Sequence, residues 1–310
     1  MDALTDLLHR ARARTALVRQ LIQRPPWSIT YADAPPLTVT TALGGPASIR
    51  LDDSGGAPVH LAAGDIALVT ASPYTIADDP GTGHQVTIRG GRKYLPGGDQ
   101  VAGDWNLAPR TYGDGLPGAT IMLRATFELH GAVSDRLLAL LPPLAVVPAG
   151  PRTGAALDLL AAEVSRDEPG QDAVLNRLLD LVLVLALRAW CAESATLPAW
   201  YRALGDPAIG EALHLLHADP ARRWTVAELA AKVGSSRAAF ATRFTTLVGE
   251  PPLTYLTGWR MTLAADLLRD SEKTVAAVAG EIGYADPFAF SVAFKRARGV
   301  SPSTWRLRPP

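Results

Sequence analysis

The pattern of apolar and polar positions near the C-terminus of this chain occurs twice. Aligning Thr225 with Thr274 places TVAELAAKVG over TVAAVAGEIG, and every apolar position matches. The second copy then carries one extra residue, after which four more pairs match: Phe240 with Phe290, Phe244 with Phe294, Gly249 with Gly299, and Pro252 with Pro302. Each copy predicts a helix, a glycine turn, a second helix and a Gly-x-x-Pro stop.

Capping residues support this interpretation. Thr225 and Glu228 form a capping box, and Asp286-Pro287 supplies an N-cap followed by a proline suited to the first helical position. Two helices joined by a short glycine turn make a helix-turn-helix, whose second helix can lie in the major groove of DNA. The matched apolar positions are expected to form the core: Val226, Leu229, Val233, Phe240, Phe244, Val275, Val278, Ile282, Phe290 and Phe294.

The segment between the copies, Leu253 to Arg269, has a helical period throughout. A helix of about 17 residues is roughly 25 Å long, which suits two recognition helices held about one DNA turn, roughly 34 Å, apart. One helix-turn-helix pattern is weak evidence, because helical hairpins pack inside many proteins. Two matched copies with a connecting helix are far more specific for DNA binding.

The rest of the chain changes its periodicity twice. Between Trp27 and Phe127, short alternating stretches separated by glycine and proline turns predict an antiparallel sandwich or barrel. Between Ser134 and Leu204 the period is helical, and the apolar helix Ala173 to Cys191 is either a core helix or a subunit interface. Residues 1–23 are interpreted as one amphipathic helix, and Leu204 to Gly210 as a short connection.

The net charge of the whole chain is zero and indicates no polyanionic partner, whereas the charge of its C-terminal part is more informative. The 310 residues carry 30 basic and 30 acidic groups. From Asp206 onward 13 basic residues face 10 acidic ones, and from Lys295 to the end there are five basic residues and no acid. This asymmetry weakly favours a polyanionic partner for the C-terminal part. The longest apolar run, Leu181 to Leu187, is too short to span a bilayer, so a soluble, cytoplasmic protein is expected.

The repeated segments resemble a known family. WTVAELAAKVGSSRAAFATRF, LVGEPPLTYLTGWRMTLAADLLR and TVAAVAGEIGYADPFAFSVAFKRARGVSPSTWR are similar to the DNA-binding domain of AraC/XylS-type bacterial transcription regulators, over about Asp206 to Arg308. AAGDIALV and LHADPARRWTVAELA resemble the subgroup with a cupin-like sensor. The resemblance implies an α+β chain: a cupin-like β-barrel with flanking helices, then an all-α domain of two helix-turn-helix units joined by a long helix.

The expected boundaries are 1–133 for the sensor barrel with its N-terminal helix, 134–205 for a helical dimerisation or linker segment, and 206–310 for the DNA-binding domain. By resemblance, the partners are double-stranded promoter or operator DNA, a second copy of the chain through the sensor half, a small-molecule effector, and RNA polymerase. An activator or a repressor without enzymatic activity, cofactor or membrane contact is implied.

Candidate DNA-binding residues are outward positions of the second helix of each copy. Arg237 is the first choice for base readout, because a guanidinium binds guanine bidentately; a phosphate or water contact is an equal alternative. Family members commonly carry arginine where this chain has Thr242 and Val292. Val292 offers only an apolar contact, for instance to a thymine methyl, so the second copy is expected to contribute less base-specific hydrogen bonding.

Phosphate neutralisation is expected from the basic end of the second copy, at Lys295, Arg296 and Arg298, unless these form a solvated basic tail. The full candidate set is Ser235, Ser236, Arg237, Ala238, Thr242, Arg243, Asp286, Pro287, Phe288, Ser291, Lys295, Arg296 and Arg298.

The sensor half lacks the residues of a metal-binding cupin. Such cupins carry Gly-x5-His-x-His and Gly-x5-Pro-x-Gly-x2-His, and this chain supplies neither, so no catalytic or metal-binding residue is expected. Glu211-x-x-His214-x-x-His217 has helical spacing, but these residues are expected at the surface. Tyr74, His84, Trp105 and Tyr112 are polar-tipped residues that either line an effector pocket or simply fill and flank the barrel.

Two other functions stay open on the sequence alone. One is a regulator without effector, whose barrel only dimerises. The other is a cupin-type enzyme or ligand carrier whose helical part is an interaction module.

Overall fold

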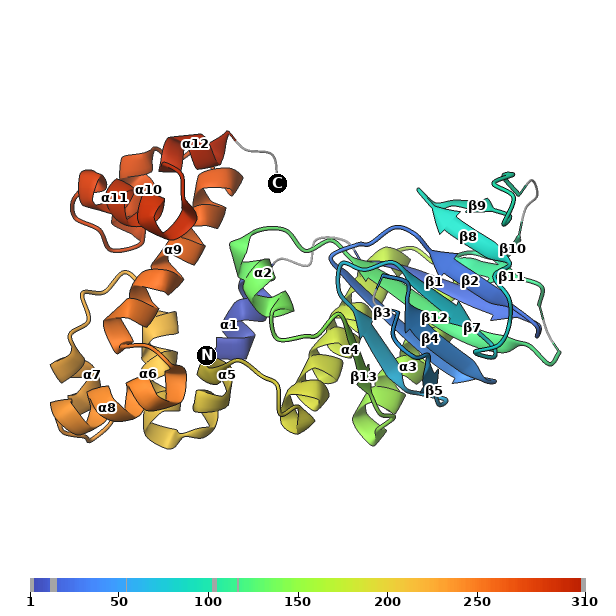
Figure 1. The fold of residues 1–310 in the computed structure, drawn as a ribbon, viewed down its shortest axis with the longest axis horizontal. Coiled ribbons are helices and arrows are strands. Elements are labelled where there is room, and N and C mark those ends of the chain that lie inside the picture. The colour runs from blue at the N-terminus through green and yellow to red at the C-terminus, as the bar shows by residue number, and fades with distance from the viewer. Residues whose placement is uncertain (1–2, 12–15, 54, 102–104, 116, 308–310) are drawn as a thin grey trace. The chain divides into compact units, whose positions relative to one another are not determined.

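Contacts within the chain divide it into two compact units in the computed structural model, which describes residues 3–11, 16–53, 55–101, 105–115 and 117–307 (Figure 1). The helical unit joins residues 1–12, 130–140 and 195–310, and the sheet unit joins 13–129 and 141–194. Two segments from the first half of the chain therefore pack with the C-terminal helices. The expected domain boundaries at 133/134 and 205/206 stay a prediction.

The sheet unit contains a seven-stranded sheet, in the order β10-β11-β1-β12-β3-β6-β13, and a six-stranded sheet, in the order β5-β4-β7-β2-β8-β9. Its strands are β1 (Ala16–Gln23), β2 (Ser28–Tyr31), β3 (Leu37–Gly44), β4 (Ala47–Leu51), β5 (Val59–Leu61), β6 (Ile66–Val69), β7 (Tyr74–Ala77), β8 (Val86–Arg89), β9 (Arg92–Tyr94), β10 (Asn106–Ala108), β11 (Thr111–Gly113), β12 (Thr120–Phe127) and β13 (Leu144–Val147). Two long helices follow, α3 (Pro151–Val164) and α4 (Gln171–Glu193).

The two sheets share one core. Alternate residues of β2 and β7, such as Ile29, Tyr74 and Ile76, pack with Ala67 of β6 and Met122 of β12, as expected for strands with one inward face. β3 and β6 are buried along nearly their whole lengths, and α3 and α4 contact strands of the same sheet. The expected α+β class is confirmed, with two facing sheets; in the described part of the chain no strand pair joins them into a closed barrel.

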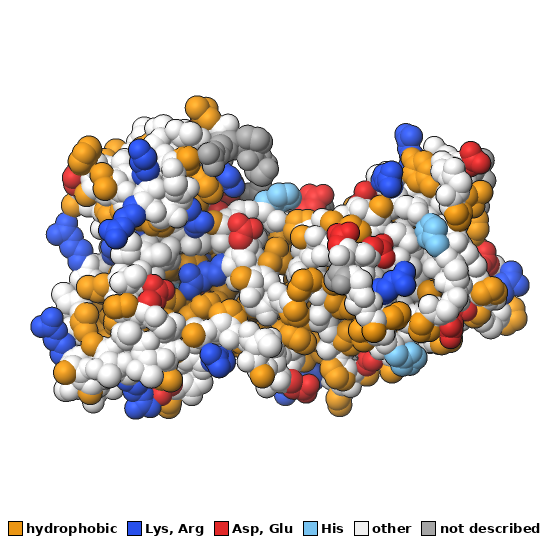
Figure 2. All heavy atoms as spheres, in the orientation of Figure 1, with side chains coloured by type: hydrophobic (Ala, Val, Ile, Leu, Met, Phe, Trp, Pro, Cys, Tyr) orange, Lys and Arg blue, Asp and Glu red, His pale blue; other side chains and the backbone are white. Residues whose placement is uncertain are grey.

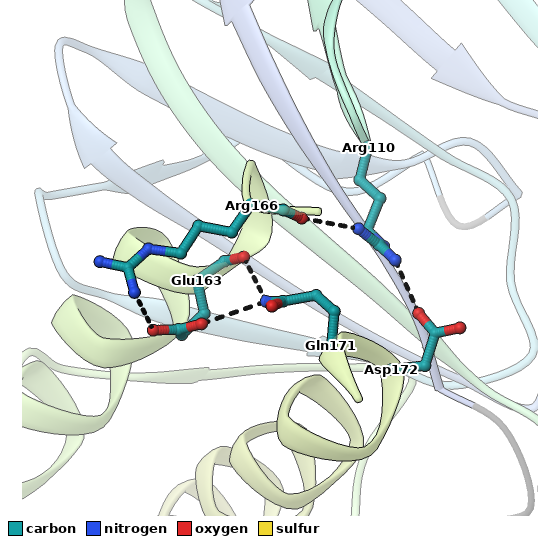
Figure 3. Close-up of polar contacts among 5 residues, drawn as sticks. All are labelled: Arg110, Glu163, Arg166, Gln171 and Asp172. Atoms are coloured by element: carbon teal, nitrogen blue, oxygen red, sulfur yellow. Dashed lines mark hydrogen bonds and ion pairs between the residues drawn. The ribbon is translucent and has the colours of Figure 1, made fainter. Parts of the chain in front are cut away.

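Polar contacts tie the turn between α3 and α4 to the sheet (Figure 3). The buried Gln171 side chain donates to the backbone carbonyl of Glu163 at 2.7 Å and to its carboxylate at 3.1 Å. Arg110, between β10 and β11, donates to the carbonyl of Arg166 at 3.1 Å and to the carboxylate of Asp172 at 2.7 Å. These bonds hold the helical pair in a fixed position beside the strands.

The expectation of one helix over residues 1–23 is wrong for residues 16–23, and residues 12–15 lie outside the described residues. Helix α1 covers Ala3–Arg10, and Ala16–Gln23 forms strand β1, which pairs with β12 along its whole length. Leu17 and Leu21 have the i, i+4 spacing of a helix, but the β-branched Val18 and Ile22 suit a strand. Pairing on both sides of β1 outweighs the local pattern.

The helical unit holds the repeated elements. Its helices are α1, α2 (Ala132–Leu138), α5 (Ala199–Arg202), α6 (Pro207–Ala218), α7 (Val226–Lys232), α8 (Arg237–Val248), α9 (Pro252–Asp270), α10 (Val275–Glu281), α11 (Pro287–Arg298) and α12 (Pro302–Arg306), with a 3-10 turn at Ala203–Gly205. Because α6 begins at Pro207, capped by Asp206, the expected connection Leu204 to Gly210 ends earlier than predicted.

Helices α1 and α2 dock on the long helices of this unit through buried polar groups. His217 of α6 is fully buried; its Nδ1 lies 3.3 Å from the Asp6 carboxylate of α1, and its Nε2 lies 2.7 Å from the Tyr255 hydroxyl of α9. Asp266 of α9 accepts the backbone amides of Ala132 and Val133 and so caps α2. The expectation that His217 lies at the surface is therefore wrong, because α1 covers it.

Candidate nucleic-acid interface and small-molecule pockets

The first helix-turn-helix consists of α7, a glycine turn and α8. Thr225 and Glu228 form the predicted capping box at the start of α7. Gly234 takes a φ of 67° in the turn, and the Ser236 hydroxyl accepts the amide of Ala239 to start α8. Phe240 and Phe244 are buried in the core of the unit, which leaves the opposite face of α8 exposed.

The second helix-turn-helix, α10 and α11, repeats this arrangement. Asp286 accepts the amides of Phe288 at 2.9 Å and Ala289 at 3.2 Å, and Pro287 takes the first helical position. Phe290 and Phe294 point inward and are fully buried. The apolar cores predicted for both copies are thus confirmed at these positions.

The outward faces of α8 and α11 differ in chemistry. Arg237 and Thr242 are exposed on α8. The first half of α11 instead exposes two large apolar side chains: Phe288 is 76% exposed and Val292, one turn later, is 56% exposed. Phe288 and Val292 lie one helical turn apart, so their side chains share one face of α11. The face of α11 therefore suits a partner with apolar groups.

Three basic candidates are free for a polyanion. Arg237, Lys295 and Arg296 are exposed, and none of them forms an ion pair with another described residue. Their charges are open to solvent or to phosphate groups.

Two other arginines of the candidate set have partners inside the unit. Arg243 forms an ion pair with Asp206, the residue that caps α6. Arg298 is half-buried and donates to the Thr262 hydroxyl at 3.2 Å, and burial lowers the pKa of its guanidinium. The sequence pattern could not indicate these contacts, because each joins residues more than thirty positions apart.

The remaining candidates are small or are engaged locally. The Ser235 hydroxyl donates to the carbonyl of Ser236, and the Ser291 hydroxyl donates to the carbonyl of Pro287. Ala238 is exposed in the first turn of α8. On the face drawn in Figure 2, apolar and neutral groups separate the basic side chains of the helical unit.

One pocket of the sheet unit, with a volume of about 310 Å³, lies on the outer face of the six-stranded sheet. It is polar: the Thr75 hydroxyl lies 2.8 Å from the Thr30 hydroxyl and donates to Asp52 at 2.8 Å. His84 bridges the hydroxyls of Thr30 and Thr87, each at 3.1 Å. His84 is thus on the outside of the sandwich.

A second pocket, about 90 Å³, lies on the inner side, between the sheets, and Tyr112 lines it. The hydroxyl of the buried Tyr74 accepts a hydrogen bond from Arg124, which lines the same pocket. Trp105 lies under the ammonium of Lys93, 4.2 Å from its ring centre. The four residues proposed from the sequence therefore fall at two places, with Tyr74, Trp105 and Tyr112 near the inner pocket.

Sequence reasoning missed the cations of the inner pocket, Arg19, Lys93 and Arg124. The signal was a charged residue within an apolar strand, as in TIMLRATF. No group of three or more histidine, cysteine, aspartate or glutamate residues in the described ranges could hold a metal ion. None of the described helices is long and apolar enough to cross a membrane.

Comparisons with known proteins find two family matches along the chain. Residues 2–192 match the family described as Cupin, and residues 229–308 match the family described as Helix-turn-helix domain. A protein of Streptomyces antibioticus named as an AraC-like transcription regulator is 32% identical and covers 100% of this chain and 99% of the relative. The HTH-type transcriptional regulator AlkR of Acinetobacter baylyi is 34% identical over 61% of this chain and 63% of AlkR.

Among solved structures, the DNA-binding domain of AdpA in complex with a target DNA is 35% identical, covers 33% of this chain and 90% of that domain, and has a TM-score of 0.31.

Proposed function

Because this chain belongs to the family of AraC-like DNA-binding transcription regulators, we propose that it reads two adjacent major-groove segments of one duplex with α8 and α11. The supporting observation is that two matched helix-turn-helix units flank one continuous helix, α9, of 19 residues. Such a helix is about 28 Å long, close to the roughly 34 Å that separates successive major grooves on one face of DNA. The relatives that match this chain over its full length are named as transcription regulators, not as enzymes.

The two recognition helices contact different chemical groups of the duplex. The exposed Arg237 at the start of α8 reads a base, because its guanidinium has no partner among the described residues and can reach the acceptor pair of guanine. On α11, Phe288 and Val292 contact thymine methyl groups. Lys295 and Arg296, further along α11, neutralise phosphates and supply affinity without sequence preference.

A footprint of the full-length chain tests this proposal. Duplexes that the chain binds are selected from a pool of random sequences. The bases that the bound chain protects are then mapped on the selected sequence. Two protected major-groove segments about 10 base pairs apart are expected. One protected segment, with a fully folded chain, would show that only one unit reads DNA.

The sheet unit modulates this binding, in our proposal, through a small-molecule effector, and it also carries the dimer contact. A stripe of apolar residues, Val174, Leu178, Leu181 and Leu185, follows one face of α4 at spacings of four and three. Val174 and Leu181 are 44% and 43% exposed, and this spacing is the one used by paired helices. In this proposal the chain binds DNA as a dimer and contacts RNA polymerase there. It acts in the cytoplasm.

The alternative in which the sheet unit only dimerises is kept open by the small volume of the inner pocket. A small molecule that binds the sheet unit and changes the affinity of the chain for DNA would exclude this alternative.

A further inference from the structure

Two arginines lie directly opposite each other in the seven-stranded sheet. Strands β1 and β12 are antiparallel, and their register pairs Arg19 with Arg124. Arg124 is on the same face of β12 as the core residue Met122, and Arg19 is on the same face of β1 as Leu21, which packs against that core. Directly opposed side chains are about 5 Å apart at Cβ, and like charges there are destabilising. Another interaction must therefore offset the repulsion between Arg19 and Arg124.

Arg124 is held rigidly. Its Nε donates to the hydroxyl of the buried Tyr74 at 2.7 Å, and its guanidinium carbon lies 4.1 Å from the ring centre of Tyr31. Tyr31 and Tyr74 stack on each other with centres 5.1 Å apart. With Nε engaged, the two terminal nitrogens remain as a planar fork, the arrangement that binds a carboxylate bidentately.

The described residues do not neutralise this pair. Neither Arg19 nor Arg124 forms an ion pair with a described carboxylate. Burial by itself would lower the pKa of Arg124, but Tyr74, Tyr31 and the Asp33 carboxylate together raise it, so the guanidinium stays charged. Burial raises the pKa of Tyr31 and of Tyr74, so both hydroxyls stay protonated at neutral pH.

The pocket beside the pair is cationic and partly apolar. Lys93 lines it together with Arg19 and Arg124, and Leu21 and Ile88 contribute apolar surface. Arginine and lysine side chains only donate hydrogen bonds. A ligand rich in hydroxyl donors, such as a sugar, would find few acceptors here, whereas an anion would find several donors.

We propose that the inner pocket binds a small carboxylate with a short apolar body, its carboxylate held between Arg124 and Arg19. The inference rests on the proposed role of the sheet unit as an effector domain and names the chemistry of that effector. The carboxylate supplies the counter-charge that the opposed arginines lack, and the apolar body lies against Leu21, Ile88 and the ring of Tyr31. The volume of about 90 Å³ suits a handful of carbon atoms.

The test uses the full-length chain and calorimetric titration with carboxylates from propanoate to hexanoate, straight and branched. Saturable binding by at least one of them is expected. The neutral amide of the same acid should bind at least tenfold more weakly, because it carries no counter-charge and its NH2 group can only donate, so it cannot accept a bidentate pair of hydrogen bonds from a guanidinium. Inorganic phosphate serves as an anion without an apolar body and should bind more weakly than the best carboxylate.

Arg19→Gln is the decisive variant, because Arg19 is exposed and its loss leaves no buried group unpaired. It should weaken carboxylate binding at least tenfold, while the unliganded variant melts no lower than the parent at low salt, since the repulsion between the two arginines is removed. A residue that only stabilised the fold would give the opposite change in melting. Arg50→Gln, in the polar pocket on the outer sheet face, is the matched control and should bind as the parent does.

Equal affinity in the Arg19→Gln variant, equal binding of acid and amide, tighter binding of phosphate, or no binding by any acid would each overturn the proposal. DNA affinity measured with and without the best acid distinguishes the carboxylate site itself from its role as an effector site. Binding that depends on Arg19 but leaves DNA affinity unchanged supports the site and rejects the effector role. DNA binding by a chain that binds none of the acids rejects the site and leaves DNA recognition standing.

Discussion

Two exposed arginines of similar chemistry are expected to differ in what they recognise. Arg237 begins α8, whereas Arg296 lies near the end of α11. Arg237→Ala should lower affinity for the selected duplex about 10- to 100-fold and relax preference at one base pair, since a bidentate base contact is worth about 1–3 kcal/mol. Arg296→Ala should weaken binding to all duplexes alike and reduce the slope of log affinity against log salt by about one.

Fluorescence anisotropy over a salt series, with the selected duplex and a shuffled one, measures both effects. The assignment fails if Arg237→Ala weakens the two duplexes equally.

The apolar face of α11 makes a separate prediction about the DNA. If Val292 and Phe288 contact thymine methyl groups, then replacing thymine by deoxyuridine in the second segment removes a methyl group of the contact. Losing one buried methyl costs about 0.8 kcal/mol, so affinity should fall roughly fourfold. Val292→Ala should bind both duplexes with nearly equal affinity. Deoxyuridine in the segment read by α8 is the control, and a larger loss there would contradict the assignment.

His217 makes the stability of the helical unit depend on pH. Burial lowers the pKa of this imidazole, with the nearby Arg136 lowering it further and the Asp6 carboxylate opposing them. Below about pH 6.5 the unfolded chain therefore binds a proton that the folded chain does not. The free energy of unfolding should fall as the pH drops from 7.5 to 5.5, by up to about 1.4 kcal/mol per pH unit.

Urea unfolding followed by tryptophan fluorescence checks this, because Trp259 stacks on His217 with ring centres 4.4 Å apart. His217→Gln should flatten the pH dependence. An equally steep decline in that variant would assign it to other groups. Asp6, whose pKa is lowered, contributes stability that is lost only when the pH falls below about 4. It therefore does not affect the free energy of unfolding between pH 7.5 and 5.5.

At the scale of the elements, the two glycine turns look alike in the sequence and differ in the fold. Gly234 and Gly283 both have positive φ, 67° and 88°. A Cβ on Gly283 would lie 2.2 Å from the carbonyl oxygen of Ala221, whereas a Cβ on Gly234 would meet nothing within 4 Å. Gly234→Ala should cost about 1 kcal/mol for its backbone conformation, and Gly283→Ala should cost about 2 kcal/mol or more beyond that.

Chemical denaturation of the two variants gives the comparison directly. Equal losses would mean that the chain near Ala221 moves aside at little cost.

Element prediction succeeded where one local pattern was reinforced by caps. Thr225, Asp286 and the two Gly-x-x-Pro stops mark the repeated helices within a residue or two, because each cap bonds to amides within its own turn. It failed for residues 16–23, where the leucine spacing suits a helix but pairing with β12 decides the conformation. Distant partners leave no local signal of this kind.

At the scale of the whole molecule, the apolar stripe on α4 predicts a dimer. Leu181→Lys should convert dimers to monomers in analytical ultracentrifugation, because it places a charge in an apolar contact at little cost to the monomer, where Leu181 is 43% exposed. Leu95→Lys is the control, since Leu95 is similarly exposed in the same unit. If the parent is a monomer at tens of micromolar, or if Leu181→Lys stays dimeric, another surface is responsible.

The sequence by itself determined that the chain has two helix-turn-helix units, where their helices begin and which residues face inward, since helical periodicity, caps and glycine turns act over a few positions. Only the tertiary structure decided which basic residues remain free, with Arg243 and Arg298 held by distant partners and Arg237 and Arg296 left exposed. It also decided that α1 covers His217 and that Arg19 lies opposite Arg124. The physical reason is that burial and charge pairing depend on contacts between segments tens to hundreds of residues apart, and these exist only once the chain has folded.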